Sequence, residues 1–96
     1  MTKHFSHSFR ERVLAIVSKI RRGHVCTYAD VARQAGSPNA YRAVGNILHK
    51  NYDSRIPCHR VIRTDGRVGG FNRGTRKKRS LLRDEGASVA LTERKR

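Results

Sequence analysis

The stretch Thr27–His49, with the sequence TYADVARQAGSPNAYRAVGNILH, decides the fold that we expect for this chain. Its first residue can cap a helix whose third position is Asp30, and Gly36 is placed to end that helix. Ser37-Pro38 then offers a capping hydroxyl followed by proline at a first helical position. Apolar residues recur at helical spacing on both sides of this junction. The pattern predicts a helix-turn-helix, and an ordinary helical hairpin is the alternative.

The second helix of this pair carries small residues at Ala40, Ala43 and Gly45. Small side chains let a helix backbone approach its partner closely, which suits a narrow nucleic-acid groove better than long-armed reading of the major groove. Arg42 lies among them and adds a positive charge. Together with the charge of the whole chain, these residues favour contact with DNA.

Two further helices flank this unit. A capping box formed by Ser8 and Glu11 predicts the start of the first, whose apolar residues recur at helical spacing as far as Ile20. Basic residues and a glycine at 21–23 then predict its end. The last helix is expected over residues 75–85, where it is followed by the stop signal Gly86.

The segment between the helices suggests a little β-structure. Cys58–Arg63 has the look of a short strand, Asp65-Gly66 is a turn signal, and Val68 can begin a return strand. We therefore expect a mainly α fold with one small β-hairpin. At 96 residues the chain predicts a single domain, 1–96, with a core at about 8–88 and a loose tail at 89–96.

The charge of the chain limits the classes of partner that it can be expected to bind. It has 22 Lys+Arg against 7 Asp+Glu, a formal net charge of +15, which indicates a polyanion and nucleic acid first of all. An anionic membrane surface is the competing interpretation. However, the chain has no Trp, and its longest apolar run, Val13–Val17, falls far short of the roughly 20 residues of a membrane span. We expect no membrane partner and no secretion signal.

The six residues Ile56–Val61, IPCHRV, place a thiol directly beside an imidazole. A thiol becomes a useful nucleophile when a neighbouring histidine can take its proton, so Cys58 and His59 predict covalent chemistry. The other cysteine, Cys26, and this one are expected to be free thiols in a reducing compartment. The His and Cys spacing fits no zinc site, so no metal is expected.

In their order, the motifs resemble the DNA-binding and active-site domain of the O6-alkylguanine-DNA alkyltransferases. The resemblance runs from about residue 9 to residue 86, nearly the whole chain, and implies a winged helix-turn-helix-like fold. Each motif is weak alone, but the ordered set is highly specific. The motifs are Thr27-Tyr28, Gly36-Ser37-Pro38 with Arg42-Ala43-Val44-Gly45, Asn51, Pro57-Cys58-His59-Arg60-Val61, Gly69-Gly70-Phe71 and Glu85-Gly86.

The resemblance implies a chemistry as well as a fold. Such proteins flip an O6-alkylated guanine out of duplex DNA and transfer its alkyl group to their own cysteine. Cys58 would be the nucleophile, His59 would take its proton through a bound water, and Glu85 would support the histidine. Asn51 would hydrogen-bond around the thiol and the base, and Tyr28 would help rotate the target phosphate and protonate the departing guanine. The thioether product implies a single-use protein without a cofactor.

The resemblance also implies how the DNA is held. Arg42 would enter the base stack and fill the space left by the flipped base. The DNA-binding residues it implies are Tyr28, Ser37, Asn39, Ala40, Tyr41, Arg42, Ala43, Gly45 and Arg60. The base pocket it implies is formed by Val61, Gly70, Phe71 and Asn72. The partner is then double-stranded DNA containing O6-alkylguanine, bound by a monomer in the cytoplasm with the nucleoid, or in a nucleus.

The chain departs from the family pattern in several places. Phe71 stands where some members have tyrosine, Asn72 where some have serine, and Tyr41 where a small residue is common. Members also usually carry an additional N-terminal domain for which this chain has no room, which suggests a minimal form or a truncated or specialised relative. Two alternatives therefore remain. One is an alkyltransferase-like sensor that binds the lesion without repairing it, although such proteins lack the cysteine. The other is an architectural DNA-binding protein with Cys58 as a core thiol.

Overall fold

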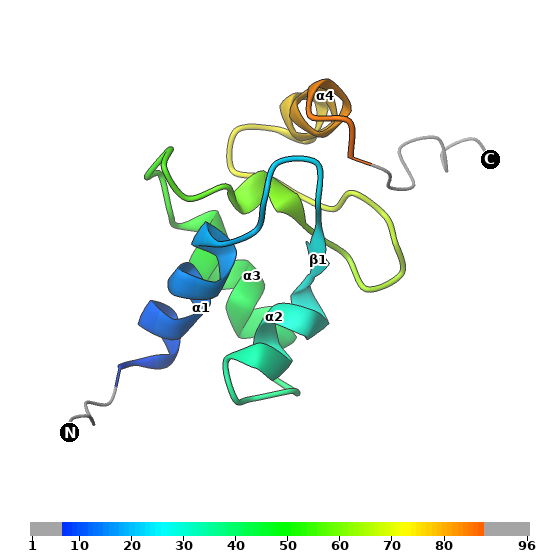
Figure 1. The fold of residues 1–96 in the computed structure, drawn as a ribbon. Coiled ribbons are helices and arrows are strands. Elements are labelled where there is room, and N and C mark those ends of the chain that lie inside the picture. Colours follow the sequence, from blue (N-terminus) through cyan, green and yellow to red (C-terminus); the bar gives the residue numbers. More distant parts are fainter. Residues whose placement is uncertain (1–6, 88–96) are drawn as a thin grey trace.

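In the computed structural model, which describes residues 7–87, three helices lie together and a fourth lies apart from them (Figure 1). A short 3-10 helix packs against both the first and the fourth helix and so lies between the two parts. The helices are α1 (Phe9–Ser18), α2 (Tyr28–Gln34), α3 (Tyr41–His49), the 3-10 helix η2 (Cys58–Arg60) and α4 (Thr75–Asp84), and the strands are β1 (Cys26–Thr27) and β2 (Val61–Ile62).

The first two helices begin where the sequence predicts. At α1, the Glu11 backbone N–H donates to Ser8 Oγ at 3.1 Å and the Ser8 N–H donates to Glu11 Oε1 at 2.9 Å. At α2, the Asp30 N–H donates to Thr27 Oγ1 at 3.0 Å, and a second capping box is complete. The predicted capping box at Ser8 and the predicted cap at Thr27 are both confirmed, because each depends only on residues three positions apart.

The predicted start of α3 at Ser37-Pro38 is wrong. The Gly36 N–H donates to Arg33 O and the Ser37 N–H to Ala32 O, so both residues close the end of α2, where Gly36 has a φ of +92°. The Ala40 N–H then donates to Ser37 O at 2.9 Å, so residues 37–40, which include Pro38, form a turn. The helix begins only at Tyr41, and no side chain caps it.

The predicted β-hairpin is also wrong. Cys58–Arg60 forms a 3-10 helix, and the strand that follows pairs in parallel with β1, in the register Cys26 to Val61 and Thr27 to Ile62. Val61 and Ile62 are both buried, which suits a strand covered on both faces rather than a hairpin with one face in solvent. The Arg63 N–H still donates to Arg67 O at 2.9 Å, but no return strand forms within residues 7–87.

The core has two parts that meet at the thiol segment. The larger part packs α1, α2 and α3 around the buried side chains of Val13, Val17, Val31 and Val44, and it includes Cys58. The smaller part lies under α4 and consists of Ile62, Val68, Leu82 and Ala87. The helices α2 and α3 pack directly on each other, as the predicted helix-turn-helix requires and as a helical hairpin would also do. None of the helices in residues 7–87 has the length and apolarity that a membrane crossing needs. The predicted tail at 89–96 lies outside the described residues.

Candidate functional site

The thiol of Cys58 lies at the first position of η2 and is nearly enclosed, with 8% of the residue exposed. Asn51 Nδ2 donates a hydrogen bond to its Sγ at 3.2 Å. Burial raises the pKa of the Cys58 thiol, and the Asn51 hydrogen bond and the charges of Arg73 and Lys78 act in the opposite direction. The site therefore contains the groups that stabilise a thiolate, but the thiol rests in its protonated form.

Asn51 is itself held in place by its neighbours. Its backbone carbonyl accepts a hydrogen bond from Asn72 Nδ2 at 2.8 Å, and the same amide also donates to His49 O at 2.8 Å. Asn72 was predicted to form part of the base pocket. Its amide joins the end of α3 to the loop before Cys58 and thereby orients the asparagine that contacts the sulfur, and its part in the base pocket stays a prediction.

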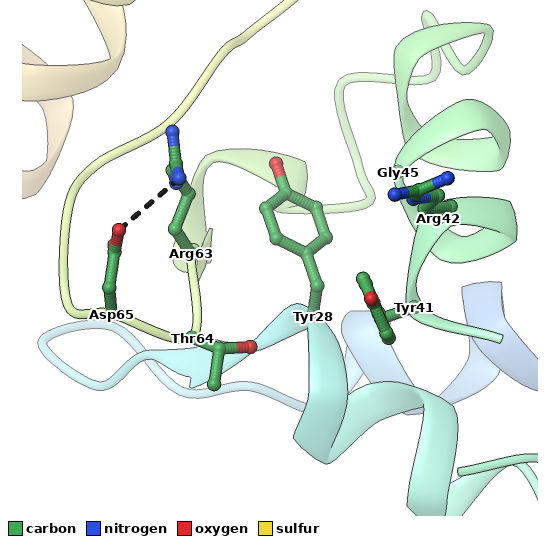
Figure 2. A pocket seen from close by; sticks show the side chains of 7 residues that line it. All are labelled: Tyr28, Tyr41, Arg42, Gly45, Arg63, Thr64 and Asp65. Atoms are coloured by element: carbon green, nitrogen blue, oxygen red, sulfur yellow. Dashed lines mark ion pairs between the residues drawn. The ribbon is translucent and has the colours of Figure 1, made fainter. Parts of the chain in front are cut away.

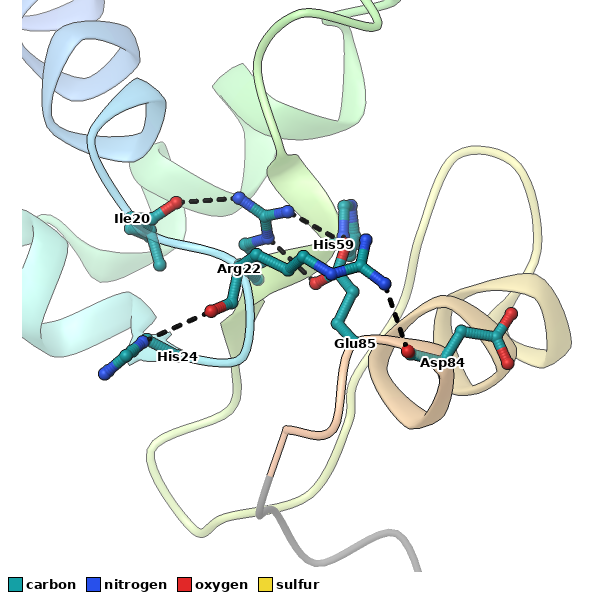
Figure 3. Close-up of polar contacts among 7 residues, drawn as sticks. Ile20, Arg22, His24, His59, Asp84 and Glu85 are labelled. Carbon is teal, nitrogen blue, oxygen red and sulfur yellow. Dashed lines mark hydrogen bonds and ion pairs between the residues drawn. The ribbon is translucent and has the colours of Figure 1, made fainter.

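The imidazole of His59 pairs with Glu85, the residue that follows α4 (Figure 3). His59 Nε2 lies 2.8 Å from Glu85 Oε2, and both side chains are largely buried. Hydrogen bonds from Arg60 and then from His59 lower the pKa of the Glu85 carboxyl to about 2. The predicted pairing of histidine and glutamate is thus present in the structure. The route of a proton from Cys58 to His59 through water stays a prediction.

Arg60 points into the protein. Its Nε and Nη2 donate to the two oxygens of Glu85, each at 2.9 Å, and its Nη1 donates to Ile20 O at 2.8 Å. Only 15% of its side chain is exposed. The geometry therefore favours an internal role, in which Arg60 fixes the carboxylate that orients His59, over the predicted contact with DNA.

Lys78, a fully buried lysine beneath the thiol segment, was not predicted from the sequence. Its Nζ donates to Val61 O at 2.7 Å and to Gly70 O at 3.0 Å, and it lies 5.6 Å from the centre of the Tyr28 ring. Burial lowers the pKa of this lysine to about 8. The helical period could have found it, because it lies one turn before the buried Leu82 on the inner face of α4.

Many of the predicted site residues line one of two cavities. A pocket of about 230 Å³ opens at the thiol and includes Asn51, Cys58, His59 and Phe71 in its wall. A more open groove of about 510 Å³ lies beside α3, and Figure 2 shows the side chains that line it. The groove is lined by Tyr28, Tyr41, Arg42, Gly45, Arg63, Thr64 and Asp65.

The groove has one wall on α3 and one on the turn after β2. Tyr41 is 47% exposed, and no hydrogen bond or ion pair holds Arg42 among residues 7–87. Across the groove, Arg63 Nη2 pairs with Asp65 Oδ2 at 3.2 Å (Figure 2). The α3 wall therefore presents a free guanidinium beside an exposed aromatic ring, the groups that can enter a base stack.

Tyr28 connects the groove to the thiol electrostatically. It lines the groove, and its pKa is raised first by burial and then by the charge of Cys58. A phenol with a raised pKa keeps its proton at neutral pH, as a proton donor must.

The other predicted residues lie outside the walls of both cavities. Val61 is fully buried, and its carbonyl accepts a hydrogen bond from Lys78; its part in the base pocket stays a prediction. The remaining ones are Ser37, Asn39 and Ala40 in the turn before α3, Ala43 on that helix, and Gly70 in the loop before Phe71. Their contacts with DNA stay predictions.

Comparison with known proteins gives consistent matches. The family described as 6-O-methylguanine DNA methyltransferase, DNA binding domain, matches residues 8–87. A methylated-DNA--protein-cysteine methyltransferase of Methanothermobacter thermautotrophicus is 45% identical over 82 residues, which are 84% of this chain and 46% of the relative. The chain thus spans about half the length of that relative.

Two solved structures carry the same fold. Mycobacterium tuberculosis OGT in complex with DNA matches with a TM-score of 0.77 at 36% identity, over 84% of this chain and 50% of that one. Schizosaccharomyces pombe Atl1, in complex with damaged DNA containing O6-carboxymethylguanine, matches with a TM-score of 0.74 at 30% identity. That match covers 83% of this chain and 77% of Atl1.

Proposed function

Since the chain belongs to the 6-O-methylguanine DNA methyltransferase family, we propose that it repairs O6-alkylguanine in duplex DNA by taking the alkyl group onto Cys58. The observation that carries this proposal is the constellation at the thiol. A nearly enclosed Sγ accepts a hydrogen bond from Asn51, and the adjacent His59 is paired with Glu85. A protein that only binds DNA has no need of this arrangement. Its substrate would place it with the DNA, in the cytoplasm or in a nucleus.

The groove beside α3 would receive the duplex. The small residues Ala43 and Gly45 allow the helix to approach a groove closely, and Arg42 can stack in the space that a flipped base leaves. An O6-alkyl group weakens base pairing, which makes extrusion of the damaged guanine less costly. The extruded base would pass Tyr28 and enter the pocket at Cys58.

The transfer is an in-line displacement at the alkyl carbon. Cys58 gives up its proton to His59 through water, its sulfur bonds to the carbon, and the bond between carbon and O6 breaks. The electron pair leaves on guanine, which takes a proton from the Tyr28 phenol, and the proton held by His59 restores the phenol through solvent. The product is a thioether that no residue of the site can cleave. Each molecule therefore acts once.

Damage sensing is the second candidate function. It is favoured by the match to Atl1, of which this chain covers 77%, against 50% of the M. tuberculosis protein. A sensor would use the same groove and the same pocket to hold the lesion. The thiol at position 58 supports transfer over sensing, because binding alone gives a nucleophile no role.

Intact mass measurement after incubation with O6-methylguanine duplex DNA distinguishes these functions. Transfer adds one methylene to the protein, and the Cys58→Ser variant should show no gain while still binding the duplex. Tight binding to the damaged duplex without any gain in mass would leave the sensor. Equal affinity for damaged and undamaged duplexes, with no gain in mass, would contradict both.

A further inference from the structure

The pocket at Cys58 has a charged wall that the transfer of a methyl group does not require. Arg73 and Lys77 both line it, one from the loop before α4 and one from the first turn of that helix. Within residues 7–87 neither forms an ion pair with an acidic side chain. Two unneutralised cations therefore face a pocket of about 230 Å³.

The guanidinium of Arg73 is held in position. Its Nη2 donates to Tyr52 O at 3.1 Å, and its central carbon lies 5.8 Å from the centre of the Phe71 ring. Its charge acts on the sulfur, since it is among the causes that lower the pKa of Cys58 against the effect of burial. A fixed cation over the pocket wall is a preorganised partner for an anion.

The one acidic residue in the pocket wall is already neutralised. Asp53 accepts hydrogen bonds from Arg55 Nε at 3.0 Å, from Arg55 Nη2 at 2.9 Å and from the Arg55 backbone N–H at 3.0 Å. These bonds lower the pKa of the Asp53 carboxyl to about 2, so it remains paired at neutral pH. The pocket wall is therefore cationic overall, and Ser54 adds a hydroxyl donor.

From this wall we infer that the pocket at Cys58 selects O6 substituents that end in a carboxylate over uncharged substituents of the same shape. The inference rests on the proposed function, because it assigns a substrate class to the same site. The base would hold its O6 carbon at the sulfur, and the carboxylate would extend between Arg73 and Lys77.

The cations would also assist the chemistry of such a substituent. A thiolate that attacks a carbon next to a carboxylate meets a second negative charge, and the two repel each other. Arg73 and Lys77 offset this repulsion. The sulfur bonds to the methylene carbon, the bond from that carbon to O6 breaks, and the thiol proton ends on guanine. Atoms and charges balance without a further reactant, and the carboxylate stays on the protein as a thioether acid.

A competition between two duplexes tests this inference. The duplexes differ only at O6, where one carries a carboxymethyl group and the other a carbamoylmethyl group, which has the same planar shape without the charge. The protein is given an equal mixture, and intact mass measures which group Cys58 takes. We expect the carboxymethyl group to be taken about tenfold faster, the effect of one charge-assisted hydrogen bond.

Three variants locate the cause. Arg73→Gln and Lys77→Gln should each lower the preference about threefold or more, whereas Arg79→Gln should not change it. Arg79 is the matched control, because it is an exposed cation of the same helix outside the pocket wall. A wild-type ratio near one would overturn the inference. Equal slowing of both duplexes by the two pocket variants would also overturn it, because it would assign the cations to the DNA backbone.

Failure of the proposed function gives a different result. If neither group is transferred, repair is contradicted, and the same comparison is made with the dissociation constants of the two duplexes. Tighter binding of the carboxymethyl duplex, lost in Lys77→Gln, would support selection of the anion without transfer. Equal dissociation constants would overturn it.

Discussion

The groove beside α3 and the pocket at Cys58 differ in size and in how firmly their side chains are held. The groove is open, about 510 Å³ in volume, and walled on the α3 side by Tyr41, Gly45 and Arg42, which has no partner among residues 7–87. The pocket is smaller, about 230 Å³, and its polar residues are held by hydrogen bonds from several elements. The first surface can fit itself to a duplex, whereas the second holds its groups in fixed positions. The difference indicates that DNA binding and chemistry can be altered separately.

The largest effect is expected for a substitution that disturbs the thiol site and leaves the groove beside α3 intact. Glu85→Gln removes a carboxylate whose pKa is about 2 in the folded protein, against 4.5 in the absence of its partners. We expect a loss of about 3 kcal/mol in the free energy of unfolding at pH 7. Because folding lowers this pKa, the contribution is complete above about pH 4.5 and disappears as the pH falls through about 2.

Urea unfolding of wild type and Glu85→Gln at pH 7, 4 and 2 measures this effect. The difference between the two proteins should shrink with falling pH, and affinity for undamaged duplex DNA at pH 7 should stay within about twofold. A difference that does not depend on pH would contradict the assignment to the carboxylate.

Arg42→Ala removes a side chain from the wall of the groove and leaves the pocket at Cys58 unchanged. We expect transfer from duplex DNA to slow about 100-fold, the cost of a misplaced substrate, because nothing then fills the space left by the flipped base. Reaction with a free O6-alkylguanine base should change less than about threefold. Rates of Cys58 alkylation with both substrates provide the measurement. Lys50→Ala, a cation at the end of α3 outside both cavities, is the control.

Lys78→Met tests the support beneath the pocket. The substitution keeps a long side chain but leaves the carbonyls of Val61 and Gly70 without their buried donor, so we expect a loss of about 2 kcal/mol in stability. The charge of Lys78 also lowers the pKa of Cys58 against the effect of burial, so its removal should raise that pKa. The pH profile of Cys58 alkylation by iodoacetamide should then move to higher pH, which loss of packing alone would not produce.

Tyr41→Ala should have the smallest effect. The ring is exposed on the groove wall, so its loss should weaken binding of duplex DNA about threefold and leave stability almost unchanged. Binding by fluorescence anisotropy and thermal unfolding together measure the two quantities. A large loss of stability would show that the ring is part of the core, and it would contradict the assignment of Tyr41 to the DNA-binding groove alone.

The sequence predicts the starts of α1, α2 and α4, whereas the local signal at Ser37-Pro38 fails because Gly36 and Ser37 close the end of α2. The capping boxes at Ser8 and Thr27 need only neighbouring residues, and both are present. Features that depend on distant partners were missed. The strand at Val61 pairs with Cys26 from before the helix-turn-helix, and no turn signal between them indicates that pairing.

The site shows the same division. Cys58 and His59 are adjacent in the chain, and the family resemblance added Glu85, which the structure places 2.8 Å from the imidazole. By contrast, the inward direction of Arg60 depends on the Ile20 carbonyl, which is far away in the sequence. The burial of Lys78 likewise depends on two loops that meet only in the folded protein.

The enclosure of Cys58 bears on how long an unused molecule lasts. A thiol acceptor that works once is lost to repair if any passing electrophile or oxidant reaches it first. Only 8% of Cys58 is exposed, and burial raises the pKa of its thiol, so at rest it offers such reagents little access and little thiolate. Under the proposed function, the same burial that slows the nucleophile would preserve it, so the unreacted protein would be spent on lesions rather than on the background chemistry of the cell.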